Sequence, residues 1–271
     1  TERGRRYLAR IAAIEGGCSE GIPAFNVNRR CGSGLRPVIS ASQSIVPGDT
    51  EIAIGGGAEN MSRTPYIAAA ARWGARMGDS TMIDMMPGAL HDPFHGIHMC
   101  VTLEDMMRLK PAFVMENGTV TAGNASGIND AAAALVLMEH IAAEERGTKP
   151  LARLVAYAHA GVDPRYMGMG SVPLTRLALQ RAGLAVDGLD VIETHEAFAA
   201  QACAVTRALG LDPAKVNPND SEIPLGHPVG ATGAVITIKA LHELLRTGGR
   251  YALVTMCIGD GPGIAAVFEN L

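Results

Sequence analysis

The sequence has neither the cysteine spacing of a disulfide framework nor that of a zinc motif. Its five cysteines are odd in number, scattered along 271 residues, and include no Cys-x-x-Cys pair. Free thiols are typical of a reducing compartment, so we expect a cytoplasmic protein. The opening residues, TERGRR, are not followed by the apolar stretch of a secretory signal peptide, and no such peptide is expected.

An excess of positive charge is also absent. The formal net charge is -4 and the pI about 6.1, so nucleic acid is not expected as a partner. Hydrophobic residues make up 48% of the chain and the mean hydropathy is +0.15, but alanine and glycine supply much of this. The apolar run at residues 131–138 is too short to span a bilayer, so no membrane association is expected.

Strands and helices alternate along the chain, which predicts an α/β fold. In the first half the pattern predicts, in order, helix 7–13, strand 22–27, helix 35–46, strand 51–54 and helix 130–145. The apolar face of the helix at 35–46 comprises Leu35, Val38, Ile39, Ile45 and Val46. Strand, helix and strand at 22–54 are typical of a parallel β-α-β unit. Residues 61–111 have little periodicity, and a loop of that length is expected to be functional or to cover a site.

The second half repeats the same order of elements. It predicts strands at 151–157, 190–193, 251–256 and 264–268, and helices at 173–182, 197–209 and from about 233 to 245. Residues 147–150 are the best candidate linker, which gives domains at 1–149 and 150–271. Residues 32–54 also weakly resemble residues 231–254. A duplicated α/β unit would bring the starts of both helices to one central site.

Cys31 lies between the first strand and its helix. The neighbouring Gly32 and Gly34 leave the backbone bare, as the close approach of a substrate would require. The partial positive charge at a helix N-terminus favours a thiolate, which makes Cys31 a candidate nucleophile. The alternative is that Cys31 is a small buried residue, as cysteines often are.

Three further segments carry candidate chemistry, and each has a plain structural alternative. His227 precedes a helix among glycines and could belong to a simple helix-entry turn. Cys257 ends a buried strand before a glycine-rich turn and could belong to a bare hairpin. His195 follows a strand and could be a helix-capping histidine.

Together, four motifs resemble those of the thiolase family. They are Cys-Gly-Ser-Gly from Cys31, His-Glu-Ala-Phe from His195, Gly-His-Pro around His227, and Cys-Ile-Gly from Cys257 to Gly259. The chain is most similar to bacterial β-ketothiolases of the acetoacetyl-CoA and polyhydroxyalkanoate type. The resemblance implies duplicated α/β domains, with helices layered between and around central sheets in the order αβαβα. It also implies acyl transfer between coenzyme A thioesters, by condensation of acetyl-CoA with an acyl-CoA or by thiolysis of a 3-ketoacyl-CoA.

The resemblance also implies a role for each motif. Cys31 would carry the acyl group, and His227 would take the proton of its thiol. Cys257 would move the proton at the α-carbon. His195 would hold a water in one oxyanion hole, and the N–H groups of Cys31 and Gly259 would form the other.

Other expectations concern coenzyme A and assembly. Ser126, His98 and Met99 match positions that line the pantetheine tunnel of the family. Acyl-CoA and CoA are then the small-molecule partners, with no separate cofactor and no metal, and a homo-oligomer (dimer or tetramer) is expected.

The sequence departs from the family pattern in four places. His195 replaces the usual asparagine, and Asp260 follows Gly259 and would put a carboxylate beside the oxyanion hole. Glu222 stands in the loop before His227 and would stiffen it. Roughly sixty residues are missing before Thr1, and about as many between His98 and Thr119, each stretch the size of a small subdomain. The loop domain would then be reduced to a remnant at about residues 72–118, and one sheet edge would be unpaired.

Two alternatives to an active thiolase remain at this stage. The chain could be an impaired, shortened homologue that at most binds acyl-CoA or associates with other subunits. A decarboxylating condensing enzyme is a third possibility, but Cys257 occupies the position that favours a thiolase.

Overall fold

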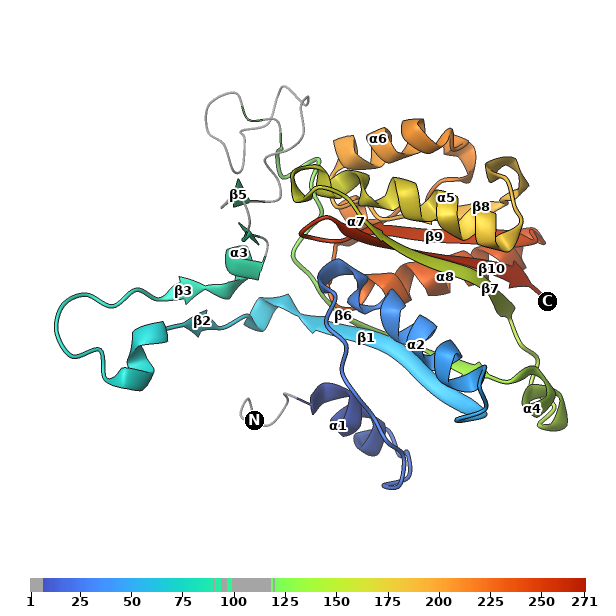
Figure 1. Ribbon diagram of the computed structural model, residues 1–271, viewed down its shortest axis with the longest axis horizontal. Helices are drawn as coiled ribbons and strands as arrows, with labels where there is room; N and C mark the ends of the chain where they lie inside the picture. Colours follow the sequence, from blue (N-terminus) through green and yellow to red (C-terminus); the bar gives the residue numbers. More distant parts are fainter. Residues whose placement is uncertain (1–6, 90, 94–96, 99–117, 119) are drawn as a thin grey trace.

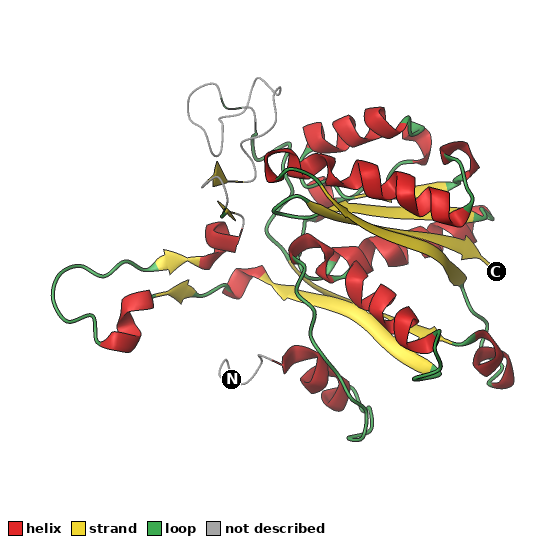
Figure 2. Ribbon diagram, in the orientation of Figure 1, coloured by secondary structure: helices red, strands yellow, loops and turns green. Residues whose placement is uncertain are grey.

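A computed structural model describes residues 7–89, 91–93, 97–98, 118 and 120–271. Layers of helices and strands alternate in it (Figures 1 and 2). Helices α5 (Ser171–Ala182) and α6 (Ala199–Leu209) cover one face of a four-stranded sheet. Helices α2 (Leu35–Ile45) and α8 (Thr232–Thr247) lie between that sheet and a two-stranded one. The expected α/β architecture of layered helices and sheets is confirmed.

The four-stranded sheet has the order β7 (Ala152–Gly161), β10 (Pro262–Asn270), β9 (Tyr251–Cys257) and β8 (Val191–Thr194). Strands β8 and β9 run parallel, whereas β10 is antiparallel to both of its neighbours. Since helices cover both faces, β8 and most of β9 and β10 are buried throughout, which explains their nearly continuous apolar runs. All four strands fall close to the positions predicted from the sequence.

The smaller sheet corrects two predictions. Strand β6 (Asp130–Met138) pairs antiparallel with β1 (Ile52–Asn60) over nine residues, so the helix expected from residue 130 is wrong. The Asp130 carboxylate accepts hydrogen bonds from Ser62 and caps no helix. Alanine is a strong helix former, but intrinsic propensity is a weak determinant of structure, and pairing with β1 overrides it here. A short helix, α4 (His140–Glu145), follows instead.

The strand predicted at residues 22–27 is also wrong, because the chain is extended there but pairs with no described strand. A strand needs a partner for its backbone groups, and without one no parallel β-α-β unit forms. Within the described residues, β1 likewise has β6 as its single neighbour, in agreement with the expected unpaired edge.

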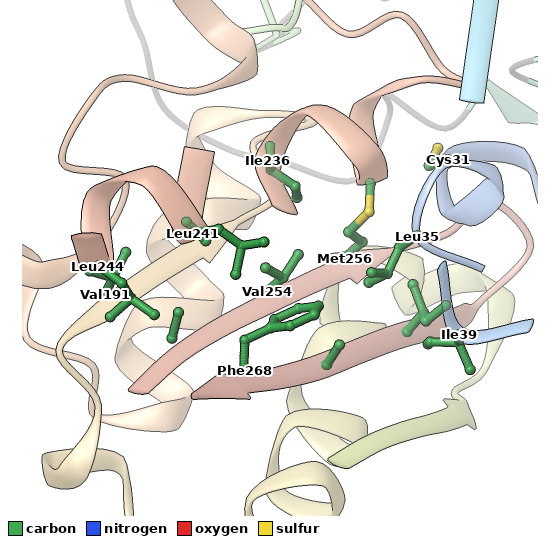
Figure 3. Close-up of a cluster of buried hydrophobic side chains, with 14 of the residues drawn as sticks. Cys31, Leu35, Ile39, Val191, Ile236, Leu241, Leu244, Val254, Met256 and Phe268 are labelled. Carbon is green, nitrogen blue, oxygen red and sulfur yellow. The ribbon is translucent and has the colours of Figure 1, made fainter. Parts of the chain in front are cut away.

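Helices α2 and α8 pack together at their N-terminal ends. A side chain on Gly34 would come within 2.8 Å of the backbone at Ala231 and Ala234, and one on Gly233 within 2.3 Å of Leu35 N. Beyond this contact, Leu35, Ile39 and Ile236 join the core formed with β9 and β10 (Figure 3). The two glycines therefore let the starts of both helices meet, as the internal repeat predicts. Val46, which was expected on the apolar face of this helix, instead follows the end of α2 and is exposed.

The remaining described elements are short or peripheral. The expected helix near the start is α1 (Leu8–Glu15). Short elements follow β1: β2 (Tyr66–Ile67), β3 (Ile83–Asp84), α3 (Met85–Ala89), β4 (His91–Asp92) and β5 (Ile97–His98). The segment that carries β2 and β3 projects away from the layers (Figure 1). No helix among the described residues has the length and apolar character to cross a membrane.

Candidate active site

Cys31 lies in a 3-10 turn (Arg30–Ser33) that leads directly into α2. Its side chain is buried at 7% exposure, and Leu35 and Ile39 follow it along the helix (Figure 3). A Cβ on Gly32 would lie 2.5 Å from Ile258 Cδ1. A side chain at Gly32 would therefore require Ile258 to move, so this glycine permits close packing against the turn after β9.

His227 is held by the first turn of α8. Its Nδ1 lies 2.7 Å from Thr232 Oγ1, and the Thr232 hydroxyl donates to the carbonyl of Pro228. Since that hydroxyl has one proton, its oxygen is left to accept from His227 Nδ1–H. Nε2 of His227 is then an acceptor, and it has no hydrogen-bond partner among the described residues.

His195 follows β8 and is fully buried. Its backbone N–H donates to Thr255 on β9, and its carbonyl accepts from the Gln201 amide. The ring centroids of His195 and His227 are 4.3 Å apart, at an interplanar angle of 51°. The strand end, rather than a helix-capping bond, positions this histidine.

Glu222 begins the four-residue helix α7 (Glu222–Leu225) and points at His195. Its Oε1 lies 3.2 Å from His195 Nδ1, and its Oε2 accepts from the Glu196 backbone N–H and from the Ser221 hydroxyl. The sequence predicted only that Glu222 would stiffen the loop. The structure corrects this, because Glu222 is buried at 2% exposure as the charge partner of His195. The sequence carried one signal of this pair, because His195 and Glu222 both depart from the family pattern.

The three side chains Cys31, His195 and His227 converge. A potential donor atom from each lies within 4.8 Å of the others, and all three residues are buried. Burial disfavours a thiolate, but the two imidazoles outweigh it and lower the pKa of Cys31 well below its ordinary value. Burial likewise opposes the charge on His195, yet the Glu222 carboxylate and Cys31 raise the pKa of that imidazole. The pKa of Glu222 is lowered despite burial, because His195 favours the carboxylate. These groups favour a thiolate at Cys31.

Cys257, at the end of β9, has the opposite electrostatics. Its side chain is buried at 1% exposure, in a small cluster that includes Met167, Ala197 and Phe198. Burial and the nearby Cys31 raise its pKa well above the ordinary value, so Cys257 keeps its proton. The structure thus provides one ionised and one protonated thiol, a division of roles that suits proton transfer. Gly259 lies two residues further on, in the buried turn that leads into β10.

Ser126 belongs to a segment whose backbone forms hydrogen bonds with both histidine motifs. Its N–H donates to Ala197 O, and the next carbonyl, of Gly127, accepts from His227 N. This segment places Ser126 beside the site. Ser126 was one of three residues expected to line the pantetheine tunnel. Of the other two, His98 is the last residue of β5, and Met99 lies outside the described residues.

Asp260 is paired rather than isolated. Its Oδ2 lies 2.7 Å from Arg30 Nε, which neutralises the carboxylate that the sequence predicts beside the oxyanion hole. Both residues have positive φ angles, 48° for Arg30 and 73° for Asp260. Two strained backbone positions therefore carry one ion pair next to Cys31.

A buried thiolate beside two histidines, with a second, protonated thiol nearby, defines a cysteine-dependent acyltransferase centre. Two thiolase domain models match the chain: the C-terminal domain at residues 148–270, and the N-terminal domain in two pieces, at residues 1–106 and 100–140. The chain therefore belongs to the thiolase family, and the expected activity class, condensation or thiolysis of acyl-CoA thioesters, is confirmed.

Individual relatives support the same assignment. The chain is 57% identical to β-ketothiolase BktB of Cupriavidus necator, over 100% of this chain and 85% of the relative. It is 40% identical to the acetyl-CoA acetyltransferase of Shinella zoogloeoides, over 97% and 83% of the two chains. The crystal structure of Bacillus anthracis acetyl-CoA acetyltransferase matches with a TM-score of 0.94 at 34% identity, covering 100% of this chain and 85% of that one. Human mitochondrial 3-ketoacyl-CoA thiolase in complex with CoA matches with a TM-score of 0.93 at 33% identity, covering 98% and 82%.

The same comparisons show that the chain is shortened. The alignment with the Cupriavidus relative is 335 residues long, whereas this chain has 271, so the relative has residues with no counterpart here. The two pieces of the N-terminal domain meet at residues 100–106, inside the interval where the sequence predicts the missing loop domain.

Proposed function

We propose that the chain acts as a β-ketothiolase through an acyl-Cys31 intermediate. The observation that carries this proposal is the convergence of Cys31, His195 and His227 in one buried cluster, with Cys257 nearby. Short acyl chains are the proposed substrates, as in acetoacetyl-CoA thiolysis or the condensation that supplies polyhydroxyalkanoate synthesis. CoA thioesters are the proposed ligands beside Ser126, His98 and Met99, and a dimer or tetramer is the proposed assembly.

The first half of the reaction acylates Cys31. The Cys31 thiolate attacks the thioester carbonyl, and a carbon–sulfur bond to Cys31 forms. The bond to the CoA sulfur breaks, and the departing CoA thiolate takes the proton that His227 received from Cys31. Backbone N–H groups of Cys31 and Gly259 are the proposed donors to the oxyanion, each worth about 3 kcal/mol in the transition state.

In condensation, the second half forms the carbon–carbon bond. In thiolysis the order is reversed, and CoA takes the acyl group from Cys31 only after that bond has broken. The Cys31 thiolate attacks the 3-keto carbonyl and keeps the acyl group, and the departing acetyl-CoA takes up at its α-carbon the thiol proton of Cys257. Its raised pKa suits this role, because the group must hold its proton until the carbon accepts it. In condensation, Cys257 first gives its proton to His227, which is neutral once CoA has left. The Cys257 thiolate then removes the α-proton, and the resulting carbanion attacks acyl-Cys31 and releases the Cys31 thiolate. His195 is proposed to hold the water that stabilises the enolate oxygen.

The test follows the loss of acetoacetyl-CoA absorbance with free CoA. We expect Cys31→Ala to abolish turnover, whereas the control Cys203→Ala removes an exposed cysteine and leaves it unchanged. Mass spectrometry of protein quenched with acetoacetyl-CoA alone should find an acetyl group on the peptide that contains Cys31. Equal rates in the parent chain and Cys31→Ala would refute the nucleophile. CoA binding without turnover or acylation would favour the impaired homologue.

A further inference from the structure

The Cys31, His195 and His227 side chains also form a ligand set for a transition metal. One sulfur and two ring nitrogens lie within 4.8 Å of one another, at residues that are all more than nine-tenths buried. In the described part of the chain, Nε2 of both histidines has no nitrogen or oxygen partner, and both rings interact with the Cys31 sulfur. A thiolate and two neutral imidazole nitrogens are all electron-pair donors, so a cation can bind all three.

The outer nitrogen of each histidine has an acceptor close by. Thr232 Oγ1 is hydrogen-bonded to His227 Nδ1 at 2.7 Å, and Glu222 Oε1 lies at an ion-pair distance of 3.2 Å from His195 Nδ1. Metal-binding histidines usually donate this second nitrogen to a carboxylate or another acceptor, which fixes the ring and leaves the other nitrogen for the metal. His227 meets that requirement, and the Glu222 carboxylate is placed to meet it for His195.

The donor types and charges favour zinc. Thiolate and imidazole ligands suit Zn²⁺, whereas Mg²⁺ and Ca²⁺ require oxygen. Zn–S and Zn–N bonds of about 2.3 and 2.0 Å place tetrahedral ligands about 3.5 Å apart, so side-chain shifts of about 1 Å close the site. The thiolate of Cys31 and the carboxylate of Glu222 balance the charge of the ion when the imidazoles are neutral.

His195 is what makes this set complete. The asparagine usual at this position in the family would leave one cysteine and one histidine, whereas the imidazole supplies a third ligand. We propose that Cys31, His195 and His227 bind one Zn²⁺ reversibly, with a water in the fourth position, and that the bound ion blocks Cys31 from acylation. The proposal depends only on these side chains, not on thiolase turnover.

The test uses Co²⁺ as a visible substitute for Zn²⁺ on the full, metal-stripped chain without substrate. We expect one equivalent of Co²⁺ to bind with a sulfur-to-cobalt charge-transfer band and tetrahedral visible bands, and Zn²⁺ to displace it. Cys31→Ala should lose the charge-transfer band. His195→Asn should weaken binding by about tenfold or more. Glu222→Gln should weaken it by about tenfold, because it removes the carboxylate behind the His195 ring. The control His242→Asn, at an exposed histidine on α8, should bind as the parent does.

A second readout measures alkylation of Cys31 by iodoacetamide. We expect one equivalent of Zn²⁺ to protect Cys31 and EDTA to restore its reactivity, while exposed Cys203 reacts equally in both conditions. A charge-transfer band that persists in Cys31→Ala, or His195→Asn binding Co²⁺ as tightly as the parent while its circular dichroism shows a folded chain, would overturn the site. Because neither readout needs turnover, an inactive chain that binds Zn²⁺ refutes only the proposed enzyme, and an active chain that does not bind it refutes only the metal site.

Discussion

Replacing Glu222 with glutamine removes one charge behind the catalytic cluster and nearly preserves the shape of the side chain. The carboxylate lies 3.2 Å from His195 Nδ1, and both side chains are buried. At that distance, with an effective dielectric constant of about 20, a unit pair attracts by about 5 kcal/mol. Without the carboxylate, burial favours a neutral imidazole, so Cys31 loses one neighbouring positive charge.

The size of the effect follows from the position of Cys31. At the same effective dielectric constant, a unit charge 4.8 Å away stabilises the thiolate by about 3 kcal/mol, and a closer charge by more. His227 keeps part of that stabilisation. We therefore expect Glu222→Gln to slow the alkylation of Cys31 at pH 7 by about tenfold or more, since a factor of ten corresponds to about 1.4 kcal/mol.

The assay is the pseudo-first-order rate of iodoacetamide incorporation at Cys31, measured by peptide mass spectrometry. Glu196→Gln is the matched control, because the Glu196 carboxylate accepts from the Asn217 amide, 2.6 Å away, whereas the charge partner of His195 is Glu222. The alkylation rate of Cys31 in Glu196→Gln should change by less than about twofold, which corresponds to a free-energy difference smaller than RT. A folded Glu222→Gln chain that reacts as fast as the parent would refute the role of Glu222.

Three further predictions test the fold and its charges. Gly34→Ala should lower the free energy of unfolding in urea by at least about 2 kcal/mol, because its Cβ would lie within 2.8 Å of backbone atoms of α8; Gly188→Ala, where nothing lies within 4 Å, is the control. Arg30→Gln should reduce turnover by about tenfold because it exposes an unpaired carboxylate, whereas Asp260→Asn, which removes that carboxylate, should change turnover less than about threefold. His159→Gln should reduce the loss of stability between pH 6.5 and pH 4. The half-buried His159 has its pKa lowered to about 4 by burial and by the charges of Arg29, Arg36 and Arg181. As the pH falls, this histidine is therefore protonated in the unfolded chain before it is protonated in the folded chain. This difference lowers the free energy of unfolding by about 1–2 kcal/mol after screening by solvent.

For each of these three predictions, one experimental result would refute the reasoning. Equal stability of Gly34→Ala and Gly188→Ala in urea titrations would mean that the helix starts can move apart at little cost. Steady-state turnover of Arg30→Gln equal to that of the parent would show that the carboxylate does not act on the oxyanion. Parallel stability curves for His159→Gln and the parent, measured by urea unfolding at several pH values, would show that the surrounding arginines do not control the protonation of this histidine.

The local sequence was sufficient for elements whose pattern agrees with their final environment. Strands β8 and β9 carry apolar runs because both of their faces are covered, and glycine-flanked Cys31 precedes a helix as expected. The alanine-rich segment at β6 failed as a helix prediction, because its pairing with β1 joins residues about 80 positions apart. Residues 22–27 failed for the complementary reason, since a strand pattern forms no strand without a neighbour.

The sequence by itself determined the residue types at the candidate site: a cysteine before a helix, a histidine in Gly-His-Pro, and a second cysteine at a strand end. It also identified the family, because four motifs in the right order are more specific than any one of them. Only the tertiary structure decided that Glu222 is the partner of His195 and that Arg30 neutralises Asp260. Such pairs depend on burial and on distances of a few ångströms between side chains far apart in the sequence. Spacing along the chain does not determine them, because electrostatic energy depends on separation in space and on exclusion of water.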